Sequence, residues 1–207
     1  MRDESFRTPI TLAGRYVELV PLEPSHRDAL FEASRDPEVF RFLRTGPVPT
    51  PEGMTRIIAD LLDNFAVGSD LPFTTRLLSG HRPIGMTRYL RIDRANQWVE
   101  IGGTWLDRRY WRTPINTETK LLLMRHAFEE EDVHRVQLQT DLRNERSQRA
   151  IARLGATREG VLRDDVLLSD GYRRSSVYYS VLQSEWPAVR ARLESALERP
   201  WSPSAGP

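Results

Sequence analysis

The residues that could do chemistry gather between Trp98 and Glu130, where a strand, a basic loop and a helix follow one another. The apolar stretch Trp98–Leu106 runs into the arginine-rich loop Asp107–Thr113, and we expect an amphipathic helix from Pro114 to Glu130. The first N–H groups of a helix lack intrahelical partners, and that end of the helix carries partial positive charge. Arginines beside such an end favour a ligand that carries phosphates. The segment therefore predicts an anion-binding site.

This segment resembles a cofactor-binding segment of a known family. Residues 109–114 read RYWRTP, and residues 115–120 read INTETK. The strand, loop and helix start resemble the acyl-CoA-binding segment of the GCN5-related N-acetyltransferases, in the branch that includes the ribosomal-protein N-terminal acetyltransferases. The resemblance extends from roughly Ile10 to Trp186. It implies an enzyme that uses acetyl-CoA as its cosubstrate.

The loop departs from the family pattern at two positions. The family reads Gln/Arg-x-x-Gly-x-Gly/Ala; Arg109 matches the first position, whereas Arg112 and Pro114 stand at the glycine positions. Glycine permits unusual backbone conformations and close approach of a ligand, and proline has no N–H to donate. Two interpretations stay open. Arginine side chains replace the lost contacts, or the site is weakened or lost and Pro114 is simply a favourable first helical residue.

The resemblance also implies where acetyl-CoA would bind. Its pyrophosphate would lie at the loop and helix start, and its pantetheine arm along the end of the preceding strand. Residues 144–147, NERS, resemble the family's Asn-x-x-Ser/Ala segment near the pantetheine and the sulfur. Asn144 could equally be only a helix cap, and the glycines could only mark a bulge. The expected cofactor contacts are Gly103, Thr104, Trp105, Leu106, Arg108, Arg109, Arg112, Thr113, Asn116, Asn144 and Ser147.

Acetyl transfer to an amine needs a base for the ammonium and an acid for the leaving thiolate. Glu100 stands where several family members keep a carboxylate base that acts through water, although a strand glutamate could also point to solvent. Many members place a tyrosine acid at the position of Ile151, which cannot donate a proton. Ser147 is the better candidate acid in its place, and Tyr178 and Tyr179 are alternative donors, although each could instead serve packing.

The sequence does not name the amine acceptor. The resemblance implies a protein or peptide N-terminus or a small-molecule amine. We expect its specificity to depend on residues 40–50, on the helix that follows them, and on the hairpin of residues 163–172. Phe40, Phe42 and Trp98 could line such a pocket, although aromatic residues are first of all core residues. Asp164 would suit a cationic acceptor.

Composition narrows the class of protein. With 39% hydrophobic and 29% charged residues, the 207-residue chain is typical of one soluble domain. It has no cysteine, which excludes disulfides and a cysteine nucleophile, and its four histidines show no metal-ligand spacing. The net charge of +1 gives no global case for nucleic acid, and no apolar run is long enough to span a membrane. We therefore expect a cytoplasmic protein without a metal, nucleic-acid or membrane partner.

The elements that must position these residues follow the order β-α-α-β-β-β-α-β-α-β-β. This order predicts an α/β (α+β) fold with a mixed, mostly antiparallel sheet of six to seven strands, flanked by helices and splayed in the middle to admit acyl-CoA. We expect a loose leader over residues 1–9, a single domain over residues 10–198 and a flexible tail over residues 199–207. Strands are expected at residues 11–21, 71–78, 82–92, 97–106, 133–141, 157–168 and 172–181.

The sequence therefore indicates an acetyl-CoA-dependent N-acetyltransferase in which the amine attacks directly, and the family makes a homodimer a further expectation. The alternative is a non-catalytic acyl-CoA-binding or interaction protein that retains the fold; the missing glycines and tyrosine favour it. A nucleic-acid-binding protein rests only on arginine clusters, which partly reflect composition, since Lys120 is the only lysine.

Overall fold

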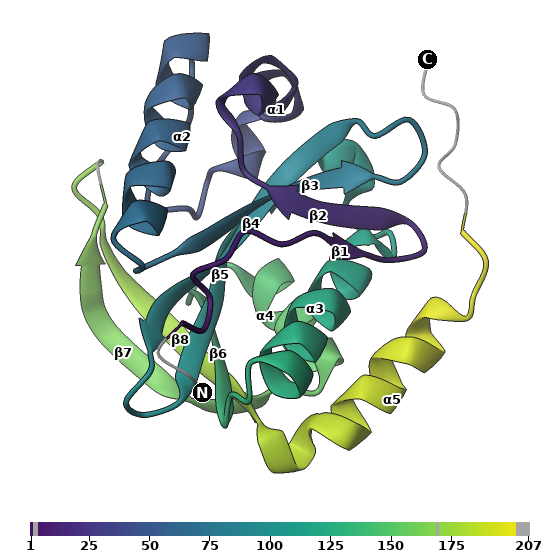
Figure 1. The fold of residues 1–207 in the computed structure, drawn as a ribbon. Helices are drawn as coiled ribbons and strands as arrows, with labels where there is room; N and C mark the ends of the chain where they lie inside the picture. The colour runs from purple at the N-terminus through teal and green to yellow at the C-terminus, as the bar shows by residue number, and fades with distance from the viewer. Residues whose placement is uncertain (2–3, 169, 202–207) are drawn as a thin grey trace.

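The computed structural model of the chain describes residues 1, 4–168 and 170–201. Within them, eight strands form one sheet in the order β1-β2-β3-β4-β5-β6-β8-β7 (Figure 1). Neighbouring strands are antiparallel except β5 and β6, which are parallel. The strands are β1 (Leu12–Ala13), β2 (Val17–Pro21), β3 (Leu71–Leu77), β4 (Pro83–Asp93), β5 (Trp98–Leu106), β6 (Arg135–Asp141), β7 (Thr157–Leu167) and β8 (Arg173–Leu182). The helices are α1 (Arg27–Ala33), α2 (Pro51–Ala66), α3 (Ile115–Arg125), α4 (Glu145–Leu154) and α5 (Trp186–Leu197).

The mixed sheet flanked by helices confirms the expected fold class, with one strand more than the six to seven expected. The additional strand arises because the expected first strand, residues 11–21, is divided into β1 and β2. Between them, the N–H groups of Arg15 and Tyr16 donate to the Glu118 carboxylate of α3, at 2.7 Å each. Gly14 permits this approach, because a Cβ there would lie 2.5 Å from Cδ of Glu118. The contact fixes the start of α3 against the sheet.

Helix boundaries follow signals that are present in the sequence. α2 begins after Thr50, whose hydroxyl oxygen accepts the N–H of Gly53 at 3.1 Å. α4 ends at Gly155, which has a left-handed φ of 101°. The long helix expected over residues 114–130 begins at Ile115 and continues from His126 to residue 130 as a π-helical turn.

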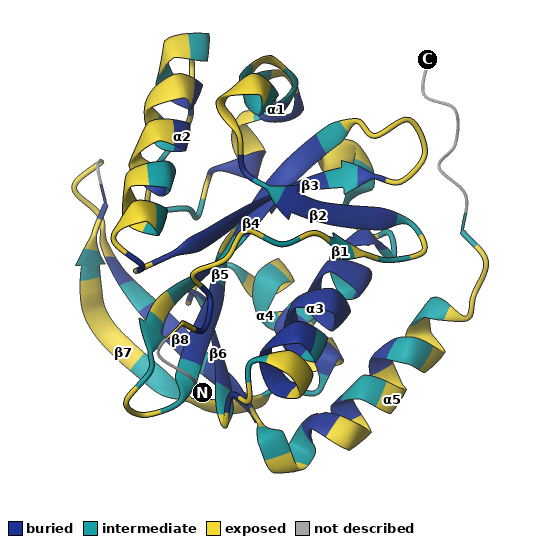
Figure 2. Ribbon diagram, viewed as in Figure 1, coloured by how far each residue is buried: buried dark blue, intermediate teal, exposed yellow. Residues whose placement is uncertain are grey.

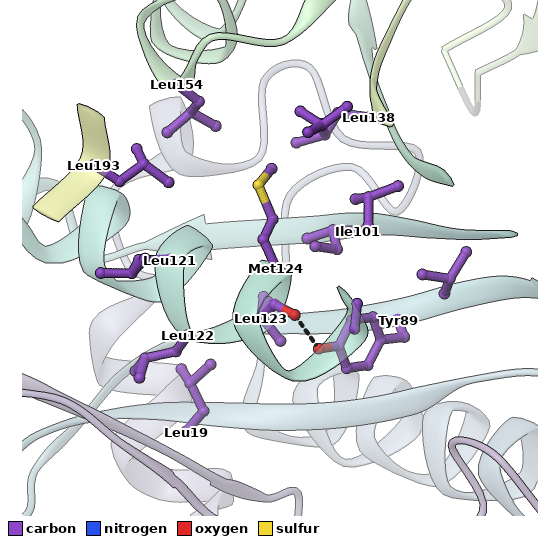
Figure 3. Close-up of a cluster of buried hydrophobic side chains, with 14 of the residues drawn as sticks. Leu19, Tyr89, Ile101, Leu121, Leu122, Leu123, Met124, Leu138, Leu154 and Leu193 are labelled. Carbon is purple, nitrogen blue, oxygen red and sulfur yellow. Dashed lines mark hydrogen bonds between the residues drawn. The ribbon is translucent and has the colours of Figure 1, made fainter. Parts of the chain in front are cut away.

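Different helices cover the two faces of the sheet. α1 and α2 pack on one face with Met86 and Trp105, and α3, α4 and α5 pack on the other (Figure 1). Figure 2 shows that α3 and the central strands are largely buried, whereas β7 is largely exposed. In Figure 3 the leucines of α3 lie among side chains from β2, β5 and α5, and the Tyr89 hydroxyl donates to the Leu123 carbonyl. α3 is therefore held rigidly at the centre of one face.

β5 and β6 separate part of the way along their length. The parallel pairing joins Trp98, Val99 and Glu100 of β5 to residues 135–137 of β6. Beyond that point β5 continues to Leu106 and β6 to Asp141 without pairing to each other. Unpaired backbone groups on facing strand edges can bind a ligand in place of a neighbouring strand. The splay expected in the middle of the sheet is thus present, and α3 and α4 begin beside it.

The chain ends pack more closely than a loose leader and tail would. Within the expected leader, residues 1–9, Ser5 and Phe6 are buried, and the centre of the Phe6 ring lies 4.6 Å from that of Tyr89. At the other end, Trp201 packs against Tyr16. The rest of the expected tail, residues 202–207, lies outside the described residues.

Candidate functional site

A cavity of about 360 Å³ lies where β5 and β6 separate. Its walls come from β4, β5, β6 and β8, from the first turns of α3, from α4 and α2, and from residues 39–45 between α1 and α2. α3 and α4 lie on one face of the sheet, and α1 and α2 lie on the other. The cavity therefore passes through the splay from face to face and can admit one ligand from each side.

β5 carries a bulge beside the cavity. Gly103 has a φ of +58°, and the register between β4 and β5 shifts next to it. A Cβ at this position would lie 3.1 Å from Nε of Arg88, so the site has little room for a side chain. A bulge leaves a residue out of the ladder and redirects the strand. The predicted contacts Gly103, Thr104, Trp105 and Leu106 all line the cavity.

The loop before α3 adopts a left-handed backbone without a glycine. Arg112 has a φ of +63°, a conformation that costs a non-glycine residue about 1 kcal/mol. Thr113 closes the loop, because its hydroxyl donates to the Tyr110 carbonyl at 2.7 Å and accepts the N–H of Ile115 at 3.4 Å. The arginine at the first family glycine position therefore adopts a backbone conformation that glycine would adopt at lower cost.

The second departure from the family pattern lies at the helix start. Pro114 occupies the N-cap position of α3, where it removes one N–H donor. Asn116 and Thr117 follow in the first turn, where N–H groups have no intrahelical acceptor. Both residues line the cavity together with Thr113. The positive end of the helix dipole and free donors thus still face the cavity.

Two of the three loop arginines expected to contact the cofactor are engaged by carboxylates. Arg108 donates to Asp36 at 2.8 Å, and Nε of Arg109 donates to both oxygens of Asp107 at 3.0 and 3.1 Å. Neither arginine lines the cavity. Arg112 does line it, and forms no ion pair with a carboxylate of the described residues.

A further cation at this end comes from α4, and the sequence analysis did not single it out. Arg146 lines the cavity, with its guanidinium carbon 3.3 Å from the centre of the Trp111 ring. Nε1 of Trp111 donates to the Leu106 carbonyl at 2.9 Å, which fixes the ring. Burial, together with nearby arginines, lowers the pKa of Arg146. Arg146 stands within the NERS segment, which is a signal in the sequence. Its position on α4 does not, however, show that it contacts the loop before α3.

Asn144 and Ser147 line the cavity at the start of α4. Oδ1 of Asn144 accepts the N–H of Ser147 at 3.1 Å, so the helix-cap interpretation of Asn144 is correct. A contact of either side chain with a pantetheine arm stays a prediction.

Lys120 of α3 places a buried ammonium in the wall between α3 and β5. The residue is 5% exposed, and Nζ donates to Oγ1 of Thr104 at 2.7 Å, which in turn lies 2.8 Å from Oγ1 of Thr87. No carboxylate of the described chain forms an ion pair with it, and burial lowers its pKa to about 7. Its charge is therefore available to a ligand in the cavity. The signal in the sequence was that this is the only lysine of the chain.

Glu100 lies at the point where β5 and β6 part, and it lines the cavity. It is buried, so the alternative that it points to solvent is wrong. Its carboxylate accepts from Nε2 of Gln137 at 3.0 Å and from Nε2 of Gln139 at 2.7 Å, and Nη1 of Arg91 lies 3.4 Å away. These donors hold the carboxylate in one orientation.

The two predicted acids differ in position. Ser147 lines the cavity. Tyr178 does not line it, and the Tyr178 hydroxyl donates to the Asp165 carboxylate at 3.4 Å. Ile151, at the position where many family members place a tyrosine acid, lines the cavity and is buried.

The predicted acceptor residues also divide. Phe40 and Phe42 line the cavity on the face covered by α1 and α2. Trp98 does not line the cavity. It pairs with Asp93 at the end of β4 and the start of β5, and its Nε1 donates to the Asp93 carboxylate at 3.1 Å. Asp164 is exposed on β7, outside the cavity. Arginines, among them Arg174, line the cavity where Trp98 and Asp164 were expected.

Neither a metal-ligand cluster nor a membrane span is found in the described part of the chain. No group of three or more His, Asp or Glu side chains there is arranged to hold a metal ion. None of the helices in those segments combines the length and the apolar character that crossing a membrane requires.

Comparison with known proteins identifies the family to which this architecture is similar. A family model described as an acetyltransferase (GNAT) domain matches residues 17–157. A Bacillus subtilis (strain 168) protein provisionally named ribosomal N-acetyltransferase YdaF is 33% identical over 102 residues. That match covers 49% of this chain and 55% of YdaF, so it spans about half the length of each.

Solved structures show the same similarity over nearly the whole chain. A structure from T. thermophilus, provisionally described as an acetyltransferase, is 43% identical with a TM-score of 0.84, and the match covers 92% of this chain and 98% of that one. Mycobacterium smegmatis RimJ, solved in complex with CoA-disulfide, is 20% identical with a TM-score of 0.78, over 92% of this chain and 96% of that one. The likeness to RimJ shows a common fold.

Proposed function

Since the chain belongs to the GNAT acetyltransferase family, in the branch similar to ribosomal-protein acetyltransferases, we propose that it transfers the acetyl group of acetyl-CoA directly to a primary amine. The observation that carries this proposal is the cavity at the splay between β5 and β6. One end of that cavity meets the start of α3, and the other opens on the opposite face of the sheet. This arrangement suits a phosphate-bearing donor on one side and an acceptor on the other.

The family supports an acetyl-CoA-dependent enzyme and does not favour the non-catalytic alternative. The loop before α3 supports the same view, because Arg112 adopts a left-handed backbone although it is not a glycine, and it lines the cavity. The interpretation in which side chains replace lost backbone contacts is therefore the one that we adopt. Cytoplasmic location and a homodimer remain predictions from the sequence.

The residues that would hold acetyl-CoA divide between its parts. Arg112, Arg146 and the N–H groups at the start of α3 would bind the phosphates, since they supply positive charge and free donors. The unpaired edge of β5 from Gly103 onward would hydrogen-bond the pantetheine amides. Acetyl-CoA would supply a thioester as the activated acetyl donor. Lys120 would place a positive charge next to this path, through its bond to Thr104.

Proton transfer would be shared between Glu100 and Ser147. Glu100 would take a proton from the acceptor ammonium, directly or through water, and the neutral amine would then attack the thioester, because the carboxylate is fixed in the cavity where β5 and β6 part. Ser147 would donate to the departing thiolate, because it lines the cavity and Tyr178 does not. A protein N-terminus has a pKa of about 8 and a lysine side chain has a pKa of about 10.4. An N-terminal acceptor is therefore deprotonated more easily by a weak base.

The acceptor class that we propose is a protein or peptide N-terminus or a small-molecule amine. The name of YdaF refers to ribosomal N-acetylation, which makes short peptides with free N-termini the first acceptors to test. Phe40 and Phe42 would form the apolar wall beside the amine.

The test is a single-enzyme assay with acetyl-CoA and a panel of peptides and small amines, read by thiol release and by the mass of the acetylated product. We expect acetylation of at least one class of amine, and we expect Glu100→Gln to lower kcat about 100-fold and to remove the acidic limb of the pH–rate profile. Exposed Glu198→Gln is the matched control. Tight acetyl-CoA binding without any acetylated product would contradict the proposed transfer, and an unchanged pH profile in Glu100→Gln would contradict the role of that residue.

A further inference from the structure

The acceptor side of the cavity is rich in arginines. On the face covered by α1 and α2, the lining includes Arg44, Arg88, Arg91 and Arg174. The lining contains two carboxylates among the described residues, those of Glu100 and Asp141. An acceptor that enters from this face therefore meets more positive than negative charge.

Most of these charges have partners within the chain. Arg88 lies 3.4 Å from the Asp70 carboxylate, and Arg91 lies 3.4 Å from that of Glu100. Asp141 is engaged by its neighbour: its Oδ1 accepts the N–H and Nε of Arg143, and its Oδ2 accepts Nη2 at 2.8 Å. Neither carboxylate of the lining is therefore free for a further strong ion pair.

Arg174 has no such partner. It lies on β8, is 5% exposed, and forms no ion pair with a carboxylate of the described residues. Its Nε donates to Oγ of Ser176 at 3.1 Å and its Nη1 donates to the Phe42 carbonyl at 3.4 Å. Both acceptors are neutral, so the guanidinium is fixed in position, and the Asp141 and Asp165 carboxylates act on its charge without forming an ion pair with it. Burial of an unpaired charge is costly, and a ligand anion would relieve that cost.

Arg44 adds a second free cation at the same place. It lines the cavity, is exposed, and likewise forms no ion pair among the described residues. It lies close enough to Arg174 to contribute, after burial, to the lowered pKa of that residue. Two guanidinium groups, one fixed by bonds to Phe42 and Ser176 and one exposed, can together bind a carboxylate through charge-assisted hydrogen bonds.

We propose that the acceptor is an amine that carries a carboxylate or another anionic group near the amine, and that Arg174, aided by Arg44, binds this group. This inference rests on the proposed acetyl transfer and specifies its acceptor. It replaces the expectation of a cationic acceptor, because Asp164, which suggested it, lies outside the cavity. The anion can come from a free amino acid or from an acidic side chain near a peptide N-terminus, and the two share the same recognition.

The first experiment compares acceptors in matched pairs that differ only in charge. Peptides that begin Ser-Asp and Ser-Asn form one pair, and aspartate and its diamide form the other. We expect kcat/KM to be at least about 10-fold higher for the anionic member of a pair, which is the preference that one charge-assisted bond provides. The pair that shows the preference identifies the source of the anion. Equal rates within both pairs, or preference for the neutral member, would overturn the proposal.

The second experiment locates the preference. In Arg174→Gln and Arg44→Gln, we expect KM for the anionic acceptor to rise, about 10-fold or more for Arg174 and less for Arg44, while the neutral acceptor keeps its KM. Arg44 is exposed, so its variant folds even if a change at buried Arg174 perturbs β8. Arg173→Gln, an exposed neighbour outside the cavity, is the matched control. Equal losses for anionic and neutral acceptors would assign the two arginines a structural role and overturn the proposal.

A binding measurement separates this inference from the proposed function. N-acetyl-aspartate and its diamide are titrated into the CoA-saturated protein, which needs no turnover. Arginine-dependent binding of the acid alone supports the proposal even if no acceptor is acetylated, a result that would count against acetyl transfer. Acetylation of neutral amines without any binding of the acid would sustain the enzyme and overturn the anionic acceptor.

Discussion

Glu118 and Lys120 lie two residues apart on α3, and both are buried, at 3% and 5% exposure. The Glu118 carboxylate accepts three backbone N–H groups, those of Arg15, Tyr16 and Val17, at 2.7 to 2.9 Å. The Lys120 ammonium has one hydroxyl partner, Thr104, and a pKa lowered to about 7. The comparison teaches that burial alone does not identify a functional charge. A buried charge whose bonds are complete holds the fold together, whereas one whose bonds are incomplete and which faces a cavity is available to a ligand.

The same distinction separates the arginines. Arg108 and Arg109 stand in the basic loop but are neutralised by Asp36 and Asp107. Arg112 and Arg146 face the cavity, and neither forms an ion pair within the described residues. Unsatisfied charges should therefore contribute to function, and satisfied charges should contribute to stability.

Among these charged residues, the largest effect on catalysis is expected from Lys120→Met. Loss of the ammonium removes the positive charge beside the path proposed for the pantetheine arm, and we expect kcat/KM for acetyl-CoA to fall about 100-fold, or about 2.7 kcal/mol. Steady-state kinetics would measure it. Arg149→Met, on an exposed side of α4 and paired with Glu145, is the control and should leave kinetics unchanged. Near-normal kinetics in Lys120→Met would show that this lysine is only a buried structural residue.

Glu118→Gln should act on stability instead. The substitution replaces a charged acceptor of three N–H groups by a neutral amide, so we expect the free energy of unfolding to fall by about 3 kcal/mol. Urea denaturation would measure it, and KM for acetyl-CoA should stay within about twofold of the wild type at a temperature where the variant is folded. A large rise in KM without loss of stability would reverse the roles assigned to the two residues.

Lys120→Met should have the opposite effect on stability, and the effect should depend on pH. Because the folded pKa of Lys120 lies below its unfolded value, the unfolded chain binds more protons between pH 7 and about 10.4, and wild-type stability rises with pH over that window. Below pH 7 the cost of the buried ammonium is fully present. We expect the variant to be more stable by at least about 1 kcal/mol at pH 6, with a smaller difference at pH 9. Denaturation at both values would measure it; a difference that grows with pH would contradict the assignment.

The smallest effects concern the loop arginines. We expect Arg112→Ala to weaken acetyl-CoA binding about 10-fold, because it removes an unpaired guanidinium from the phosphate end. Arg108→Ala, which removes a guanidinium paired with Asp36, should change affinity less than about twofold. Calorimetric titration would measure both. Arg112→Gly should lose affinity in the same way and yet gain about 1 kcal/mol of stability, because glycine removes the cost of the left-handed backbone. Equal losses for Arg108 and Arg112 would show that the loop acts through its total charge.

The sequence predicted the secondary structure well because its signals are local. Thr50 before Pro51 and Gly155 after Leu154 mark helix ends by their own chemistry, and the alternation of the strands is visible in short stretches. The division of the first strand was not predictable in this way. It depends on Glu118, which is about 100 residues away in the sequence. Burial of Phe6 against Tyr89 depends on a contact of the same kind.

The candidate site was predicted only where the family resemblance carried it. Gly103 to Leu106, Thr113, Asn116, Asn144 and Ser147, which that resemblance named as cofactor contacts, all line the cavity, and their contact with acetyl-CoA stays a prediction. Arg108 was included for its charge and Arg109 also because it matches the first position of the family pattern, and a sequence does not show that Asp36 and Asp107 neutralise them. Arg146 and Arg174 were missed because their availability to a ligand depends on the lack of an ion-pairing carboxylate beside them in the folded chain, which a sequence does not show. The charge of a residue can be read from the sequence, whereas the ion pairs that neutralise it depend on the tertiary structure.

The most direct test of this account is the number of protons taken up when CoA binds. Calorimetric titrations at pH 8 in two buffers of different ionisation enthalpy give this number. Lys120 is mostly neutral at pH 8 in the free protein, and a nearby ligand anion would restore its proton. We predict uptake of up to about one proton by the wild type and none by Lys120→Met, with Glu118→Gln behaving as the wild type. Equal uptake by the wild type and Lys120→Met would contradict the claim that the unsatisfied charge of Lys120 serves the ligand.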